Sequence, residues 1–233
     1  EPVLYDLSLT IPDRQFACIL GPSGCGKTTL LNLVAGFITP SRGHVFFDDA
    51  LIEGPGSDRG VVFQDANLFP WLTVRKNVEF ALRLRGVDHN ATRDIAGKYL
   101  DLVGMASYED AFPHTLSGGM RQRTAISRVL ALEPKALLMD EPFSSLDANA
   151  REHLQDELLK IWQHQQRTLI YITHSVEEAA YLADRVIVMG PSPQNIRGDM
   201  LLQSVRPRKR SSEEMRNATA ELRAALDSLP CCV

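Results

Sequence analysis

Apolar and polar residues recur along this chain with two periods, one typical of strands and one of helices. Near the start, apolar Val3, Tyr5, Leu7, Leu9 and Ile11 alternate with polar residues, which predicts a half-buried strand over residues 3–11. Short apolar runs predict further strands at Phe16–Leu20, His44–Asp48, Gly60–Gln64, Ala136–Asp140, Thr168–Thr173 and Arg185–Met189. We therefore expect strands at both ends of the chain and few in its middle.

Helical stripes occupy the spaces between these runs. They predict helices at 27–35, between Thr73 and Gly86, before Gly104, after Ser117, and at about 149–164 and 176–184. Ser175 and Glu178 form an S-x-x-E capping box for the last of these. A last amphipathic helix is expected near the C-terminus, with its apolar face formed by Met215, Ala218, Leu222, Ala225, Leu226 and Leu229. Strands that alternate with helices indicate an α/β fold, with a mostly parallel sheet and a helical insertion at 65–132.

Length and composition suit one globular domain with an inserted subdomain. The chain has 233 residues, 44% hydrophobic and 23% charged, with a net charge of -4 that gives no reason to expect a nucleic-acid partner. The four cysteines, Cys18, Cys25, Cys231 and Cys232, fall in no metal-ligand or disulfide pattern, which favours a reducing compartment. No apolar run reaches the ~20 residues that a membrane helix needs, so any role at a membrane would be peripheral.

The strongest local motif follows the strand at Phe16–Leu20. It fits G-x-x-x-x-G-K-[ST], lies between a strand and a helix, and reads Gly21-Pro22-Ser23-Gly24-Cys25-Gly26-Lys27-Thr28. Glycines let backbone N–H groups converge on phosphates, and the following helix N-terminus favours an anion. Lys27 is suited to the β- and γ-phosphates and the Thr28 hydroxyl to Mg²⁺. A chance match is expected in only about one per cent of chains of this length, so we predict a phosphate loop.

Two carboxylates end the strand at Ala136–Asp140. Asp140 is suited to a Mg²⁺ shell and Glu141 to polarising an attacking water, since neighbouring strand residues point to opposite faces. The segment Leu116-Ser117-Gly118-Gly119 opens a helix about twenty residues earlier and offers a second anion-binding end. By itself that segment would more simply be an N-cap.

Taken together, these motifs resemble the ABC ATPase family in order and spacing. Gln64 matches the Q-loop, Ser145-Leu146-Asp147 the D-loop, and His174 the switch histidine of that family. Met120 departs from the family's usual glutamine. Tyr5 lies inside the strand pattern and does not fit the adenine-stacking aromatic, which we expect to precede this sequence.

The resemblance implies an ATP- and Mg²⁺-dependent ATPase fold with a RecA-like core, an antiparallel β portion and a helical insertion. It implies a core at about 1–64 and 133–200, a helical subdomain at about 65–132 and a tail at about 201–233. The catalytic residues would be Glu141, His174 and Gln64. Metal ligands would be Thr28, Gln64 and Asp140. Nucleotide contacts would come from Gly21 through Thr29 and from Ser117, Gly118, Gly119 and Asp147.

The partners implied are a second copy of the chain, in a head-to-tail ATP sandwich, and a multi-span membrane permease. A substrate-binding protein would take part indirectly, and the chain itself would lie peripherally at the cytoplasmic face of the inner membrane. The exposed-looking segment Leu68-Phe69-Pro70-Trp71 would dock the permease, although local packing would explain its aromatics as well. The basic run Arg206–Arg210 is expected to be a solvated tail.

Within the family, the segments around Gln64 and Asp140 look like those of the nitrate, sulfonate and taurine importers. Two other classes remain as alternatives. The first is a soluble ABC ATPase of DNA repair or translation, which usually carries long coiled coils or two cassettes. The second is a P-loop kinase or GTPase, against which the Ser117 segment and His174 argue.

Overall fold

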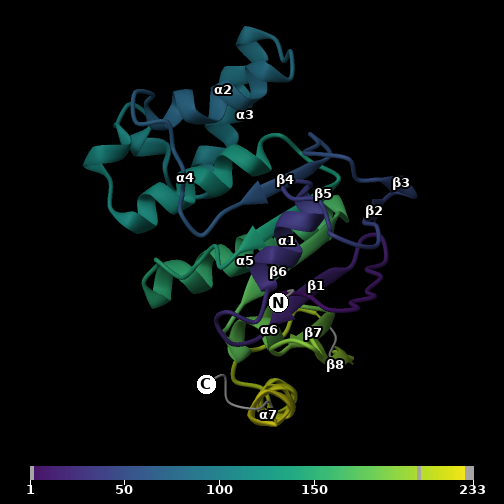
Figure 1. The fold of residues 1–233 in the computed structure, drawn as a ribbon. Coiled ribbons are helices and arrows are strands. Elements are labelled where there is room, and N and C mark those ends of the chain that lie inside the picture. The colour runs from purple at the N-terminus through teal and green to yellow at the C-terminus, as the bar shows by residue number, and fades with distance from the viewer. Residues whose placement is uncertain (1–2, 204–205, 229–233) are drawn as a thin grey trace. The chain divides into compact units, whose positions relative to one another are not determined.

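The computed structural model describes residues 3–203 and 206–228 of the chain (Figure 1). The chain divides into two compact units, residues 1–56 with 166–233 and residues 57–165, which we call the first and second unit. The predicted helical subdomain, residues 65–132, lies wholly within the second unit. Among the described residues, no helix is both long and apolar enough to cross a membrane.

The first unit is built on strands in the order β6-β1-β7-β8. The first three are parallel and the last is antiparallel to its neighbour. Their bounds are β1 (Phe16–Leu20), β6 (Thr168–Thr173), β7 (Arg185–Met189) and β8 (Ile196–Leu201). Every residue of β1 is fully buried, as expected for a continuous apolar run covered on both faces. This strand therefore forms the centre of the unit's core.

Helices cover these strands: α1 (Lys27–Ala35), α6 (Val176–Leu182) and α7 (Glu213–Asp227). α1 packs on β6, α6 packs on β1 and β6, and α7 packs on α6 and β7 (Figure 1). The predicted C-terminal helix is confirmed, because Met215 and Leu222 are buried on its inner face, while Leu229 lies outside the described residues. The predicted stop of α1 at Gly36 is also confirmed, since Gly36 has the left-handed φ of 80° that favours glycine.

The second unit combines two parallel strands with a group of helices. The strands are β4 (Arg59–Val62) and β5 (Ala136–Asp140). The helices are α2 (Val74–Leu84), α3 (His89–Leu102), α4 (Gly118–Leu130) and α5 (Ala148–Gln165), with short turns at Ala106–Tyr108 and Pro113–Thr115. Thr73 and Ser117 accept hydrogen bonds from the Lys76 and Met120 N–H groups, so both predicted N-caps are confirmed.

The strand predicted over residues 3–11 is wrong. Leu7, Leu9 and Ile11 are half-buried and Ser8 and Thr10 exposed, so the alternation reports burial correctly from Leu7 on, whereas Val3 and Tyr5 are exposed. However, the Asp6 backbone has a φ of 44°, and the Tyr5 N–H donates to the Asn195 side chain at 2.7 Å. The segment is thus held by side-chain contacts, without strand pairing among the described residues.

The antiparallel portion is smaller than expected. The predicted strand at His44–Asp48 shortens to β2 (Phe46–Phe47), which pairs antiparallel with β3 (Ala50–Leu51). Asp48 and Asp49 both have positive φ, which turns the chain tightly between the two strands. Neither β3 nor β8 was predicted, because each contains several polar or exposed residues and lacks a clear apolar alternation.

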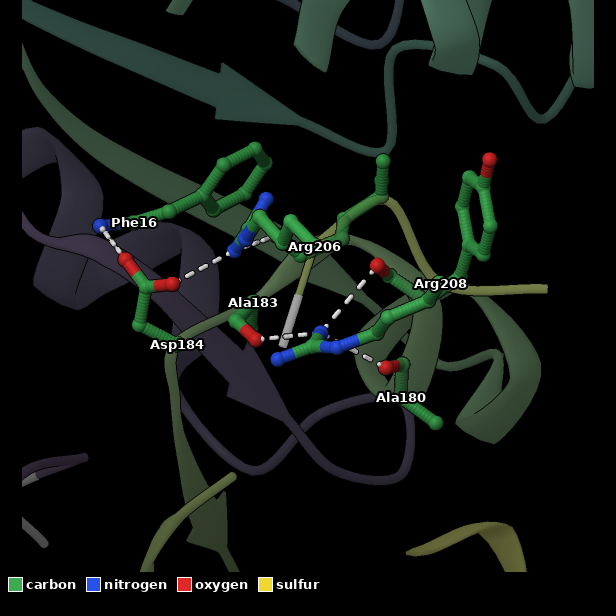
Figure 2. A network of polar contacts seen from close by, with 8 residues as sticks. Phe16, Ala180, Ala183, Asp184, Arg206 and Arg208 are labelled. Atoms are coloured by element: carbon green, nitrogen blue, oxygen red, sulfur yellow. Dashed lines mark hydrogen bonds and ion pairs between the residues drawn. The ribbon is translucent and has the colours of Figure 1, made fainter. Parts of the chain in front are cut away.

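The basic run at 206–210 is not a solvated tail, which corrects the sequence-based expectation. Arg208 is only 8% exposed, and its Nη1 donates to the Ala180, Tyr181 and Ala183 carbonyls at 2.9, 3.1 and 2.6 Å (Figure 2). Arg206 donates to the Leu182 carbonyl at 2.5 Å and to the Asp184 carboxylate at 2.7 Å. These guanidinium groups satisfy the last carbonyls of α6, which have no partner within the helix.

Candidate nucleotide-binding site

The loop between β1 and α1 has the backbone shape that phosphate binding requires. Gly24 and Gly26 have φ values of 81° and 100°, which residues with a Cβ rarely adopt. A Cβ on Gly21 would collide with the Met189 carbonyl of the neighbouring strand β7. The glycines therefore provide both the turn and the close approach, and Gly26 caps α1 without a side-chain hydrogen bond.

The lysine of this loop points back over the loop itself. The Lys27 Nζ donates to the Gly21 and Pro22 carbonyls, both at 2.8 Å, and the side chain is 6% exposed. Ser23, Gly24 and Thr28 are exposed, whereas Cys25 is buried. A buried cation thus lies within a glycine-containing loop at the N-terminus of α1, an arrangement suited to a polyphosphate.

His174 emerges beside this loop in the same unit. It directly follows β6, which pairs in parallel with β1 in a register that sets Leu20 opposite Thr173. The carboxyl ends of parallel strands meet at one edge, where ligands of such sheets bind. The structure therefore brings the phosphate loop and His174 together, and the His174 side chain is exposed.

In the second unit, Gln64, Asp140 and Glu141 gather at the carboxyl edge of two strands. β4 and β5 are parallel and in register at Val62 and Met139, so both chains leave the sheet side by side. Asp140 is buried, Glu141 is half-buried and Gln64 is exposed. Glu141 has a φ of 43°, a strained value for a residue with a Cβ, which is common at functional sites.

The glycine–serine segment lies in the same unit, next to the Ser145–Asp147 turn. A Cβ on Gly119 would approach the Leu146 side chain to 2.9 Å, so this glycine allows the two segments to pack closely. Ser117 and Gly118 are exposed at the start of α4. Asp147 caps α5, because its carboxylate accepts the Ala150 N–H at 2.9 Å.

Two residues that sequence reasoning missed fix the segment around Gln64. Gln122 of α4 is buried, and its Nε2 donates to the Phe63 carbonyl at 2.9 Å. Arg128, also on α4, donates to the Asn67 and Ala66 carbonyls at 2.9 and 3.2 Å, and burial lowers its pKa. In the sequence, the one signal for this role of Gln122 and Arg128 was their position on the helix that begins after Ser117. α4 thus connects the Ser117 segment with the chain that carries Gln64.

The candidate residues therefore fall into two sets. The phosphate loop and His174 are assembled in the first unit, and Gln64, Asp140, Glu141, Asp147 and the Ser117 segment in the second. Within the described residues there is no cluster of three or more His, Cys, Asp or Glu side chains suited to a metal. A single site composed of both sets stays a prediction.

The comparison with protein families decides what this arrangement is. The family model described as "ABC transporter" matches residues 4–144. The chain belongs to the ABC transporter family. It is an ATP-binding and ATP-hydrolysing subunit, with the α/β fold of the family's cassettes.

Named relatives and a solved structure agree with this assignment. The chain is 49% identical over 196 residues to the taurine import ATP-binding protein TauB of Yersinia pestis, covering 84% of this chain and 77% of that one. It is 47% identical over 199 residues to the nitrate import ATP-binding protein NrtD of Synechocystis, covering 85% and 75%. A dimeric post-hydrolysis structure of the ATP-binding cassette MJ0796, bound to ADP and Pi, matches with a TM-score of 0.79 and 29% identity, covering 87% and 92%.

Proposed function

We propose that the chain energises the import of a small anion, a sulfonate such as taurine or nitrate. The observation that carries this proposal is the near-equal identity to a taurine and a nitrate import subunit, each across more than four fifths of this chain. The transported substrate does not touch the ATP-binding subunit, so the substrate class rests on relatedness. A soluble ABC ATPase of DNA repair or translation is the alternative, and neither named relative favours it.

The loop geometry supports the proposed phosphate contacts. The backbone N–H groups of the loop Gly21–Gly26, except at Pro22, which has none, would together with Lys27 hold the β- and γ-phosphates of ATP. Ser23, Cys25 and Thr29 complete the segment that surrounds them. Lys27 now contacts carbonyls of its own loop, so phosphate oxygens would replace these two carbonyls as its partners. The His174 side chain, exposed at the same edge, would reach the γ-phosphate.

The donor set fits Mg²⁺. The Thr28 hydroxyl, the Gln64 amide oxygen and the Asp140 carboxylate are hard oxygen donors, which this ion prefers. One carboxylate is enough, because Mg²⁺ at nucleotide sites usually keeps water and phosphate ligands. The bound ion would neutralise phosphate charge. Glu141 would accept a proton from the attacking water, and its strained backbone would fix the direction of that carboxylate.

A second copy of the chain is the proposed partner at the nucleotide. Ser117 and Gly118 are exposed at the N-terminus of α4, an anion-binding end directed to solvent. A facing subunit could bring a γ-phosphate to this end, with Gly119 and Asp147 beside it. The similarity to a dimeric cassette supports a dimer, and the head-to-tail arrangement within it is part of our proposal.

The proposed membrane partner would dock on an aromatic surface formed by Phe69, Trp71 and Phe80. Trp71 is 71% exposed and Phe80 40%. The Phe69 ring lies 5.5 Å from Trp71 and 4.9 Å from Phe80, and Leu68 and Pro70 complete the loop. Such an apolar patch is costly in water and typical of an interface. A permease held there would place the chain at the cytoplasmic face of the inner membrane, with a substrate-binding protein on the other side.

The proposal is tested by reconstituting the chain with its permease and binding protein in vesicles. We expect ATP hydrolysis to rise, and uptake to occur, with either taurine or nitrate but with no unrelated solute such as a sugar. Glu141→Gln should keep ATP binding and lower turnover to less than a tenth, because an amide cannot take the water's proton. No stimulation by either anion would refute the import assignment. Normal turnover of Glu141→Gln would refute the role of Glu141 alone.

A further inference from the structure

The turn that carries His174 is enclosed by a ring of hydrogen bonds. The Ser175 N–H donates to the Thr173 hydroxyl oxygen at 3.0 Å, and that hydroxyl donates to the Glu178 carboxylate at 2.7 Å. The Glu178 N–H in turn donates to the Ser175 hydroxyl oxygen at 3.2 Å, as the N-cap of α6. The ring thus links the residues on both sides of His174 to one carboxylate on the first turn of the next helix.

This carboxylate is buried against the sheet. Glu178 is 8% exposed, and the same oxygen, Oε2, also accepts the Tyr171 hydroxyl at 2.9 Å. Tyr171 and Thr173 are two apart on β6, so both hydroxyls point to the face on which α6 packs. Glu178 therefore fastens the start of α6 to the end of β6, with His174 in the two-residue link between them.

The negative charge of Glu178 affects the pKa of a buried thiol nearby. Burial raises the pKa of the Cys18 thiol well above its usual value, and the nearby negative charge of Glu178 raises it further, whereas Lys27 lowers it. Cys18 lies opposite Tyr171 in the paired strands. The Glu178 carboxylate thus lies close to β1, the strand that leads into the phosphate loop.

Burying a carboxylate is costly, and an apolar residue of similar size would satisfy packing alone. Compared with an apolar residue, Glu178 adds hydrogen bonds between fixed donors and acceptors. These bonds define one orientation for the turn that carries His174. His174 is exposed, so burial contributes little to hold its ring, and the backbone of this turn sets the position from which its side chain extends.

We propose that Glu178 is a positioning residue for His174, which it holds in line with the γ-phosphate through Thr173 and Ser175. The proposal rests on the proposed function, in which His174 contacts that phosphate. A misplacement of about 1 Å at a reacting centre can lower a rate by about 100-fold. Loosening the ring should therefore lower kcat while ATP binding, which depends on the phosphate loop, is kept.

The test compares Glu178→Leu, Thr173→Val and Glu178→Gln in the full chain. The first two variants remove the acceptor or the relay and should lower kcat by roughly 10- to 100-fold, with the Kd for a non-hydrolysable ATP analogue nearly unchanged. Glu178→Gln keeps an acceptor oxygen and should retain most of the turnover. Adding Glu178→Leu to His174→Ala should cause no further loss, because the histidine that the ring positions is already gone.

The matched control is Arg208→Met, which loosens the opposite end of α6 and leaves the ring intact. Its kcat should stay near that of the unaltered chain at a temperature where all variants are folded. A loss equal to that of Glu178→Leu would mean that general rigidity of α6 is what matters, and would overturn the proposal. Normal kcat in Glu178→Leu or Thr173→Val, with His174→Ala inactive, would also overturn it. Full activity of His174→Ala would refute the role of His174, and this inference with it.

Discussion

Replacement of Arg208 by methionine should destabilise the chain more than any other change in the basic run. Methionine keeps the apolar stem but removes the guanidinium group, which donates to three carbonyls at the C-terminal end of α6 (Figure 2). Burial, and the charge of Arg206, lower the pKa of Arg208 to about 10. The side chain therefore stays charged at neutral pH, where it also complements the negative end of the helix dipole.

The magnitude follows from what the substitution leaves behind. A buried polar group without a hydrogen bond costs about 1–3 kcal/mol, and three carbonyls lose their donor together. Part of this is offset, because the Arg208 Nε is itself buried without a hydrogen-bond partner among the described residues. Water reaching some of the carbonyls lowers the cost further. We expect a loss of about 3 kcal/mol in the free energy of unfolding, a substantial share of the ~5–15 kcal/mol typical of a domain.

Thermal unfolding of the purified chain measures this loss. For a chain of this size, about 3 kcal/mol corresponds to a fall in melting temperature of roughly 6–12 °C. Lys209→Met is the matched control, because Lys209 is the exposed neighbour in the same run and should change stability by less than ~0.5 kcal/mol. Equal melting temperatures for the two variants would show that the run is a solvated tail after all, and would refute the capping argument.

Three further predictions concern other parts of the chain. Ser117→Arg should abolish hydrolysis but leave ATP affinity of the single chain near normal, and equal loss of both, by titration and turnover assay, would contradict a site shared between subunits. Trp71→Ala, alone or with Phe69→Ala, should weaken co-purification with the permease by about 2 kcal/mol or more with little change in melting temperature. A lower melting temperature with unchanged co-purification would instead show that the Trp71 and Phe69 rings serve local packing. Gly36→Ala should cost at least ~2 kcal/mol, because its Cβ would meet the Gly54 carbonyl, whereas Gly43→Ala, at a similar φ of 78° but in open space, should show only the smaller backbone cost.

Elements with a strong local signal could be predicted from the sequence. The bounds of β5, β6 and β7 agree with the predicted strands, because each is a continuous apolar run between turn residues. Helix starts at Thr73, Ser117 and Ser175 follow from side chains that cap within three residues. The loop between β1 and α1 likewise depends on neighbours in sequence, so its place between a strand and a helix could be predicted.

Contacts between distant segments could not be predicted in this way. The strand expected at 3–11 failed because pairing needs a partner, and the amide of Tyr5 is instead satisfied by Asn195, 190 positions away. Arg206 and Arg208 looked like solvated charges because nothing in their own segment indicates the open carbonyls of α6, more than twenty residues earlier.

Glu178 shows how a local prediction can be right and still miss the function of a residue. Its N–H meets the Ser175 cap as the capping box predicts, but its carboxylate contacts Tyr171 and Thr173. Any residue with a backbone N–H at position 178 could donate to the Ser175 hydroxyl and cap the helix. Only the fold, which lays α6 across the end of β6, gives the acid its two hydroxyl partners. A short helix whose first turn is fastened beside His174, and whose last turn is held by Arg206 and Arg208, has little freedom at either end. The turn that carries the histidine is thus fastened by two hydroxyl contacts that the helix-start pattern does not predict.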